Sequence, residues 1–248
     1  MNYSSEAMAK LTAHRYGKAR VRVLKILRDG PVHTLKDLEV AAYLQGDFAS
    51  SYTSGDNTKV VPTDTMKNTI NVFAQQHLGA EIERFAVILA EYFLSRYAQV
   101  ADVGIKISER RWERLAIDGQ PHPHSFQAGS EGRMFTHVVC DRKTKTIRSG
   151  IRDLVILKST GSGFENYPKD EFTTLPETAD RILATSLRAS WTFTKKPISY
   201  RAQNDKIITA MLNELSMELG AALGQERIYV AFADRTWILD ADEQARGA

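Results

Sequence analysis

The first strong pattern in the chain is an alternation of apolar and polar side chains with a period of two. It runs from Arg20 to Leu27, where Val21 and Val23 share one face. Alternating β-branched residues are typical of a strand. The turn Asp29-Gly30-Pro31 follows, and a second extended run covers Val32 to Phe48. The pattern therefore predicts a long antiparallel hairpin.

The pattern then changes to helical spacing. A polar loop ends in a helix-start signal at Pro62 to Asp64, and a helix is predicted over Thr65 to Leu78, where Gly79 breaks it. A second helix is predicted over Glu81 to Tyr97. Its apolar side chains recur on one face and indicate a side packed against the core; they are Phe85, Ile88, Leu89, Tyr92 and Phe93.

Two further extended segments complete a first unit. They cover Gly104 to Leu115 and His122 to Arg142, and the turn Asp118-Gly119-Gln120-Pro121 joins them. The order strand, strand, helix, helix, strand, strand predicts an antiparallel sheet with its helices on one face, an α+β fold. We expect this unit to span residues 16–144, after a flexible N-terminus of residues 1–15 that lacks any periodicity.

A second unit is expected over residues 145–248. Strands are predicted over Thr146 to Lys158 and Ile182 to Thr194, with a long connection between them. An amphipathic helix is predicted over Lys206 to Leu223. Residues Ile228 to Leu239 are interpreted as another helix, although the aromatic and β-branched residues in this segment favour a strand. The second unit then repeats strand, strand, helix, helix, and we expect its last strands to be missing.

Composition narrows the class of protein. The chain has 248 residues, of which 43% are apolar and 25% charged, as in ordinary globular domains with a real core. Its net charge is +3 with the basic residues spread out, which disfavours nucleic acid and anionic membranes as partners. Cys140 is the single cysteine, so intramolecular disulfides are excluded. Without a signal peptide, a membrane-spanning run or a C-terminal peroxisomal signal, a cytoplasmic location is expected.

The densest group of binding-type residues lies between Lys158 and Leu183. Phe164 offers an aromatic face and Arg181 a guanidinium. A planar, anionic ligand needs a surface to stack on and a cation to pair with, so these two residues are candidates for its site. The alternative is that Phe164 packs into the core and Arg181 forms a surface ion pair. From the residues alone both interpretations stay open.

Other candidate residues also have two interpretations. His122 and His124 share one face of a predicted strand, but two ligands without a placed acidic or cysteine partner disfavour a metal site. Lys18 is a surface lysine or, in desolvated surroundings, a base. Thr63 and Asp64 form a helix cap or contribute to an anion site at the free N–H groups of a helix N-terminus.

Several motifs together resemble those of the urate oxidases (uricases). They lie between about Tyr16 and about Trp191 and comprise Tyr16-Gly17-Lys18, SYTSGDN with VVPTDTMKNTI, GQPHPHSF, LKSTGSGF and DEFTTLPETADRILAT. The resemblance implies the tunnelling fold (T-fold), an α+β architecture with two units in tandem. It also implies a homotetramer whose active sites lie at subunit interfaces.

The resemblance assigns a binding role to five residues. Phe164 matches the aromatic residue that stacks on urate, and Arg181 the arginine that pairs with the anionic edge of urate. Leu175 matches an apolar wall of the pocket. Thr63 and Asp64 match a pair that contacts the purine from a neighbouring subunit.

The resemblance also implies the reaction. Lys18 and Thr63 match two members of a lysine–threonine–histidine relay that moves protons and places water. Urate, O2 and water would give 5-hydroxyisourate and hydrogen peroxide. Neither a metal nor an organic cofactor is implied, because the urate dianion reduces O2 directly.

The C-terminal end departs from the family pattern. The family takes a urate-binding glutamine from a Ser-Val-Gln element, and here only Gln225 lies at about the matching position. The Pro-Asn-x-His segment with the relay histidine does not occur in this sequence. Two hypotheses remain, an active urate oxidase of purine breakdown and a non-catalytic relative with a purine-binding or structural role. A pterin enzyme of the same fold is disfavoured, because the buried glutamate and zinc ligands of such enzymes have no match.

Overall fold

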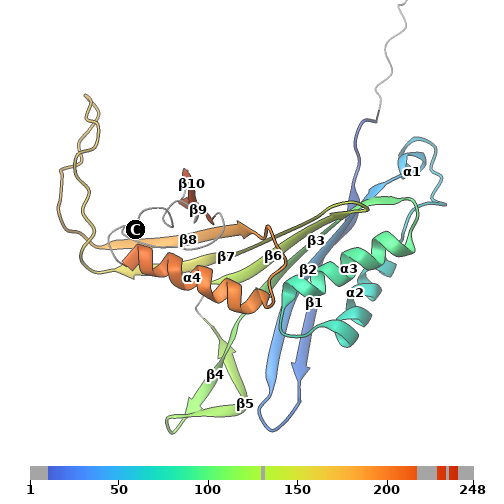
Figure 1. Cartoon of the computed structure of the whole chain (residues 1–248), viewed down its shortest axis with the longest axis horizontal. Coiled ribbons are helices and arrows are strands. Elements are labelled where there is room, and N and C mark those ends of the chain that lie inside the picture. The colour runs from blue at the N-terminus through green and yellow to red at the C-terminus, as the bar shows by residue number, and fades with distance from the viewer. Residues whose placement is uncertain (1–10, 130–131, 217–227, 233–234, 240–248) are drawn as a thin grey trace, which may run out of the picture. The chain divides into compact units, whose positions relative to one another are not determined.

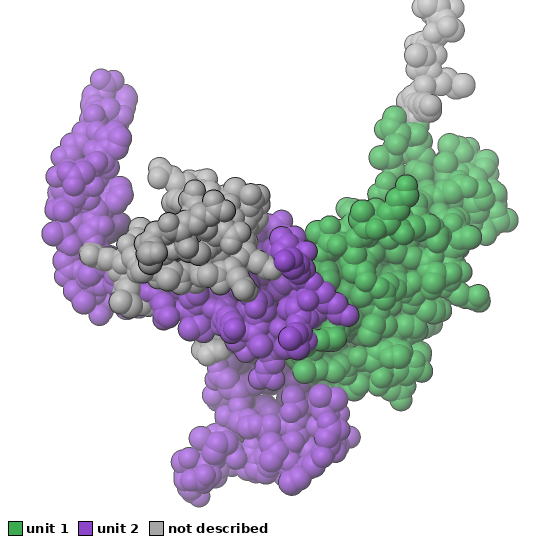
Figure 2. All heavy atoms as spheres, in the orientation of Figure 1, with its two compact units in different colours: residues 1–25, 36–108, 136–147 green, residues 26–35, 109–135, 148–248 purple. Residues whose placement is uncertain are grey.

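The computed structural model describes residues 11–129, 132–216, 228–232 and 235–239 (Figure 1). These residues fold into two compact units, and each unit is built from several segments (Figure 2). Unit 1 combines residues 1–25, 36–108 and 136–147, and unit 2 combines residues 26–35, 109–135 and 148–248. The units are therefore interleaved along the chain, and the division into two fold repeats at residues 144 and 145 stays a prediction.

Unit 1 holds most of a sheet whose strands are hydrogen-bonded in the order β1-β2-β3-β6. The predicted hairpin is confirmed as β1 (Tyr16–Leu27) and β2 (Thr34–Gly46), and β3 (Val100–Arg110) and β6 (Arg133–Asp141) follow. Alternate side chains of β2 are fully buried, which gives the sheet one core-facing side; they are Leu38, Val40, Ala42 and Leu44.

Two helices cover that sheet on one face (Figure 1). They are α2 (Thr63–His77) and α3 (Ile82–Arg96), and both were predicted. A short helix in the preceding loop, α1 (Ala49–Thr53), was not predicted. The buried side chains of α2 and α3 recur every three or four residues, as expected for one helix face; they include Met66, Ile70, Ala74, Phe85, Leu89 and Phe93.

Lys25 of β1 closes the C-terminal end of α2. Its Nζ donates hydrogen bonds to the carbonyl oxygens of Ala74 (3.1 Å), Gln75 (3.0 Å) and Leu78 (2.8 Å). The last carbonyls of a helix have no partner within the helix and lie at the negative end of its dipole. The ammonium of the half-buried Lys25 therefore supplies both the hydrogen-bond donors that these carbonyls need and a positive charge at the negative end of the dipole.

Lys25→Met is expected to lower the free energy of unfolding by about 2 kcal/mol, because methionine keeps the apolar stem but removes three charge-assisted hydrogen bonds. Urea denaturation measures the change. Lys145→Met is the matched control. It removes an exposed ion pair with Glu91, which is worth about 1 kcal/mol or less. Equal losses in the two variants would contradict a capping role for Lys25.

The two extended segments predicted after the second helix are each divided in the structure. Part of each leaves the main sheet as an antiparallel pair, β4 (Trp112–Ile117) and β5 (Gln120–Ala128). Asp118 (φ 52°) and Gly119 (φ 75°) are both left-handed, which is the geometry of a tight two-residue hairpin turn. The expectation of two unbroken strands is therefore wrong, because this turn makes a separate hairpin.

Unit 2 contains an antiparallel sheet that is joined to a helix. β7 (Lys145–Lys158) and β8 (Leu183–Thr192) confirm the two predicted strands, and their register runs from Arg148↔Thr192 to Lys158↔Leu183. The helix α4 (Tyr200–Ser216) follows. The indole N–H of the buried Trp191 donates to Oδ1 of the buried Asn204 at 2.9 Å and so ties β8 to α4. The remainder of the predicted helix, residues 217–223, lies outside the described residues.

The interpretation of residues 228–239 as a helix is wrong. They form two short strands, β9 (Ile228–Phe232) and β10 (Arg235–Leu239), which pair with each other from Arg235↔Phe232 to Leu239↔Ile228. β9 also pairs with β8, so a pair of strands does follow α4. The hydrogen bonds to β8 favour a strand over a helix in this segment. Its aromatic and β-branched residues favour a strand as well. The predicted α+β class with antiparallel strands is confirmed.

Candidate active site

The connection between β7 and β8 carries three of the predicted site residues. It covers residues 159–182 and extends beyond the sheet of unit 2 (Figure 1). Its two arms meet where Phe164 and Thr178 exchange backbone hydrogen bonds of 2.7 and 3.2 Å. Gly163 permits this approach, because a Cβ at that position would lie 2.9 Å from the carbonyl oxygen of Ala179. The connection is thus a structured arm rather than a loose loop.

Asp180 closes the base of this connection. Its carboxylate accepts hydrogen bonds from the Thr160 hydroxyl (2.8 Å) and from the backbone N–H of Gly161 (2.5 Å). These hydrogen bonds hold the pKa of the Asp180 carboxyl below its ordinary value. The bond from the Thr160 hydroxyl has the largest effect, and the bond from the Gly161 N–H has the second largest. Gly161 has a φ of 68°, a left-handed conformation that glycine adopts without strain. The Gly-Ser-Gly run therefore serves the turn that leads to Phe164.

Phe164 and Arg181 lie together on the surface. The Phe164 ring is 40% exposed, and the Arg181 Cζ lies over it at 5.0 Å from the ring centroid. Arg181 forms no ion pair with any residue that the structure describes. The interpretation of Phe164 as a core residue and Arg181 as an ion-pair partner is therefore wrong. A cation and a stacking surface occupy one place, as a planar anion requires.

Leu175 lies in the same connection, and its side chain is 51% exposed. The backbone carbonyl of Leu175 accepts a hydrogen bond from the hydroxyl of Tyr167. The Tyr167 ring in turn stacks on the Phe164 ring, with centroids 4.6 Å apart and planes 15° apart. Sequence reasoning missed Tyr167, although an aromatic residue three positions after Phe164 was a visible signal.

Thr63 and Asp64 lie in unit 1 and are the first two residues of α2. Both side chains are exposed. Pro62 occupies the N-cap position, and no side chain caps the helix there. The interpretation of Thr63 and Asp64 as a simple helix cap is therefore wrong. The first backbone N–H groups of α2 remain available to a ligand.

Two cations and one neutral hydrogen-bond donor act on Asp64. The Lys67 ammonium donates to Oδ1 of Asp64 at 2.6 Å and holds the pKa of this carboxyl below its ordinary value. The Asn68 amide, which donates to Oδ2 at 2.8 Å, and the charge of Lys18 act in the same direction. Lys18 is half-buried on β1, and within the described residues its ammonium makes no hydrogen bond or ion pair. The charge of Lys18 therefore acts on the first turn of α2.

Tyr16 holds this region together. Its hydroxyl accepts a hydrogen bond from the Val61 N–H (2.7 Å) and donates one to the Val61 carbonyl (3.1 Å). Burial raises the pKa of Tyr16 above the ordinary value of a tyrosine phenol, which is already protonated at neutral pH. The chain next to Lys18 is thereby fixed to the segment that leads into Thr63. This anchoring role of Tyr16 was not predicted from the sequence.

The predicted residues thus form two groups. Phe164, Leu175 and Arg181 belong to one connection in unit 2, and the structure brings an additional residue, Tyr167, against them. Lys18, Thr63 and Asp64 form the second group, in unit 1. Gln225, the remaining predicted residue, lies outside the described residues.

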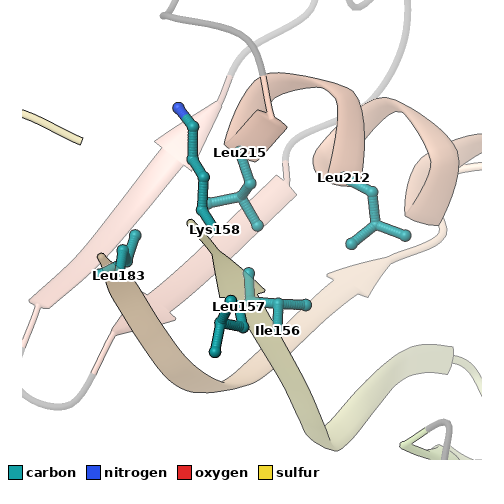
Figure 3. A pocket seen from close by; sticks show the side chains of 6 residues that line it. All are labelled: Ile156, Leu157, Lys158, Leu183, Leu212 and Leu215. Atoms are coloured by element: carbon teal, nitrogen blue, oxygen red, sulfur yellow. The ribbon is translucent and has the colours of Figure 1, made fainter. Parts of the chain in front are cut away.

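An apolar recess lies at the base of the β7–β8 connection, with a volume of about 270 Å³ (Figure 3). Five of its six lining residues are leucines or isoleucines, and the sixth is Lys158. The ammonium of Lys158 donates to the carbonyl oxygen of Gly161 at 2.6 Å. A purine anion needs several polar partners, so this recess does not fit it.

The histidines of the hairpin contact one another. The rings of His122 and His124 meet edge to face with centroids 4.5 Å apart. The centroid of the His33 ring lies 5.7 Å from that of the His124 ring. In the described part of the chain, no three histidine, cysteine or acidic side chains have the geometry of a metal site. Nor is any described helix long and apolar enough to cross a membrane.

Comparison with known proteins identifies the family. A profile of the uricase family matches residues 14–139 and 147–218. The chain belongs to the uricase family. These matched segments contain every predicted site residue except Gln225.

Relatives and solved structures agree with this assignment. A uricase from Dictyostelium discoideum is 41% identical over 197 residues, which are 78% of this chain and 68% of the relative. For a uricase from Aspergillus flavus the identity is 41%, with 74% of this chain and 62% of the relative covered. The crystal structure of a uricase from Arthrobacter globiformis is 28% identical and superimposes with a TM-score of 0.80 over 98% of both chains. For five curated uricases, including that from Aspergillus flavus, the matched region covers 60–63% of the relative, which is less than two thirds of its length.

Proposed function

We propose that this member of the uricase family is a urate oxidase of purine breakdown. The observation that carries the proposal is the position of the Arg181 guanidinium over the exposed Phe164 ring, at 5.0 Å from its centroid. Urate is planar and anionic at neutral pH. Phe164 would stack on its ring, and Arg181 would leave its own position over that ring to pair with the anionic edge of urate. Leu175 would form an apolar wall beside it.

Lys18 and Thr63 would carry the proton chemistry. Lys18, which has no hydrogen-bond partner among the described residues, would act in its neutral amine form and take up a further proton from urate through the hydroxyl of Thr63, becoming an ammonium. The free N–H groups at the start of α2 would stabilise the resulting dianion. Asp64, kept ionised by Lys67, would contact the purine through its backbone.

The proposed reaction is balanced without a cofactor. The urate dianion gives two electrons to O2, which takes up two protons and leaves as hydrogen peroxide. Water then adds to C5 of the oxidised purine and yields 5-hydroxyisourate. The protein would hold the substrate and place the protons and the water, so neither metal nor flavin is required.

We propose further that the active site lies between the subunits of a homotetramer. Thr63, Asp64, Phe164, Leu175 and Arg181 all have exposed side chains in the single chain. Exposed binding residues in two separate groups are what a site completed by a neighbouring subunit requires.

Oxygen consumption by the purified protein tests the function. In air-saturated buffer, added urate should disappear with one O2 consumed and one hydrogen peroxide released per urate. Dialysis against a metal chelator should leave the rate unchanged. Urate binding in anaerobic calorimetry without turnover in air would favour the non-catalytic relative. Neither binding nor turnover would contradict both forms of the proposal.

A further inference from the structure

The Phe164 ring is held from the side by Tyr167. Asn166, between them in the chain, has a φ of 59°, a left-handed conformation that asparagine tolerates and that reverses the backbone direction. The reversal places the Tyr167 ring against the Phe164 ring, 4.6 Å away and nearly parallel. Phe164 and Tyr167 form what we call the aromatic stack. The turn at Asn166 thus brings the two rings of the stack together.

The Tyr167 ring also contacts a cation. The Lys169 ammonium lies over the Tyr167 ring, 5.5 Å from its centroid. An ion pair of 3.0 Å with Glu177 holds Lys169 in place, and the Glu177 carboxylate also accepts a hydrogen bond from the Asn166 N–H at 3.2 Å. The half-buried Tyr167 ring therefore contacts both Phe164 and Lys169, whereas Phe164 is exposed.

The hydroxyl of Tyr167 reaches a third point. It donates a hydrogen bond to the carbonyl oxygen of Leu175, on the opposite arm of the connection. One side chain thus contacts the residue proposed to stack on the substrate and the residue proposed to wall the pocket.

We propose that Tyr167 is a positioning residue that holds Phe164 and Leu175 in place before the purine binds. The proposal rests on the proposed urate site. Ordering a mobile aromatic ring when a ligand binds costs conformational entropy. A ring that is already held in place avoids this cost. Loss of Tyr167 should therefore weaken binding of the planar substrate, while the chemical step changes little once the substrate is bound.

Two substitutions at Tyr167 separate its contributions. Tyr167→Ala removes the stack and the hydrogen bond, and the dissociation constant of urate in anaerobic calorimetry should rise about tenfold, as should KM in air. Tyr167→Phe keeps the ring and loses only the hydrogen bond, so both constants should rise about threefold. The value of kcat should change by less than about twofold in each variant. Tyr167→Leu replaces the ring with a smaller apolar group if alanine prevents folding.

Phe172→Ala is the matched control, because Phe172 lies in the same connection and is 81% exposed. It should leave the dissociation constant and KM unchanged. A second measurement needs no substrate: trypsin should cut the connection after Lys169 several-fold faster in Tyr167→Ala than in the wild type or in Phe172→Ala.

The outcomes distinguish this proposal from the proposed function. A wild-type protein that binds urate, with unchanged affinity in Tyr167→Ala, would overturn the positioning role alone. A wild-type protein that does not bind urate would overturn the proposed function. In that case faster cleavage of Tyr167→Ala would still support the role of Tyr167 in ordering the connection, and equal cleavage would overturn it.

Discussion

Replacement of Lys18 by methionine is expected to abolish most urate turnover while urate still binds. kcat should fall by about a hundredfold to ten-thousandfold, the range that a positioned base contributes. Methionine fills the same half-buried position on β1 but cannot accept a proton. Oxygen uptake gives kcat, and anaerobic calorimetry gives the dissociation constant of urate, which should change by less than about threefold.

The control for Lys18 is Lys145→Met, which removes another lysine of unit 1 that pairs with Glu91 on the surface. It should leave both kcat and urate affinity at wild-type values. Loss of urate affinity with kcat retained in Lys18→Met would show that Lys18 binds the substrate instead of moving a proton. The assignment of Lys18 as a base would then be wrong.

Arg181→Ala is expected to weaken urate binding by about tenfold to a hundredfold, because a hydrogen-bonded charge pair with an anion is worth about 1.5–3 kcal/mol. Arg181→Lys should recover only part of the affinity, since an ammonium cannot offer two parallel donors to the edge of a purine. Anaerobic calorimetry measures both variants without interference from turnover.

Arg188→Ala controls for the loss of a positive charge from unit 2. Arg188 is also exposed, and its Cζ lies 5.6 Å from the centroid of the Phe135 ring, much as Arg181 lies over Phe164. Urate affinity should be unaffected in Arg188→Ala. An equal loss in both variants would mean that urate is attracted by net charge and not bound by Arg181.

A mixture of the two impaired variants, assayed at a urate concentration far below the dissociation constant of Arg181→Ala, tests where the halves of the site come from. If each site combines Lys18 of one subunit with Arg181 of another, co-expressed Lys18→Met and Arg181→Ala chains should recover about a quarter of wild-type activity. Random pairing makes half of the subunit pairs mixed, and one of the two sites in each mixed pair is intact. Sites formed within one chain would give no recovery beyond the sum of the two variants.

The regular elements follow from local patterns in the sequence. The period of two over β1 and β2, and the apolar stripes of α2 and α3, depend on residues a few positions apart. These elements were accordingly predicted with small errors in their ends. Motif identity also selected Phe164 and Arg181, which the structure brings together.

The errors lie where distant residues decide between local alternatives. Residues 228–239 were interpreted as a helix, and pairing of Ile228 to Ala231 with β8 makes the first part of this segment a strand. The β4–β5 hairpin was merged into longer strands, because a continuous extended pattern does not reveal where a turn detaches a pair of strands from its sheet.

From its sequence alone, this chain could be placed in a fold class, divided into elements and matched to a family, because periodicity and motifs are local properties. Whether Phe164 was a core residue or a surface for a ligand was decided only in three dimensions. The backbone pairing of Phe164 with Thr178 and the closure of the connection by Asp180 join residues fourteen or more positions apart. These contacts keep Phe164 on the surface under Arg181 and against Tyr167, because the connection folds on itself instead of into the core.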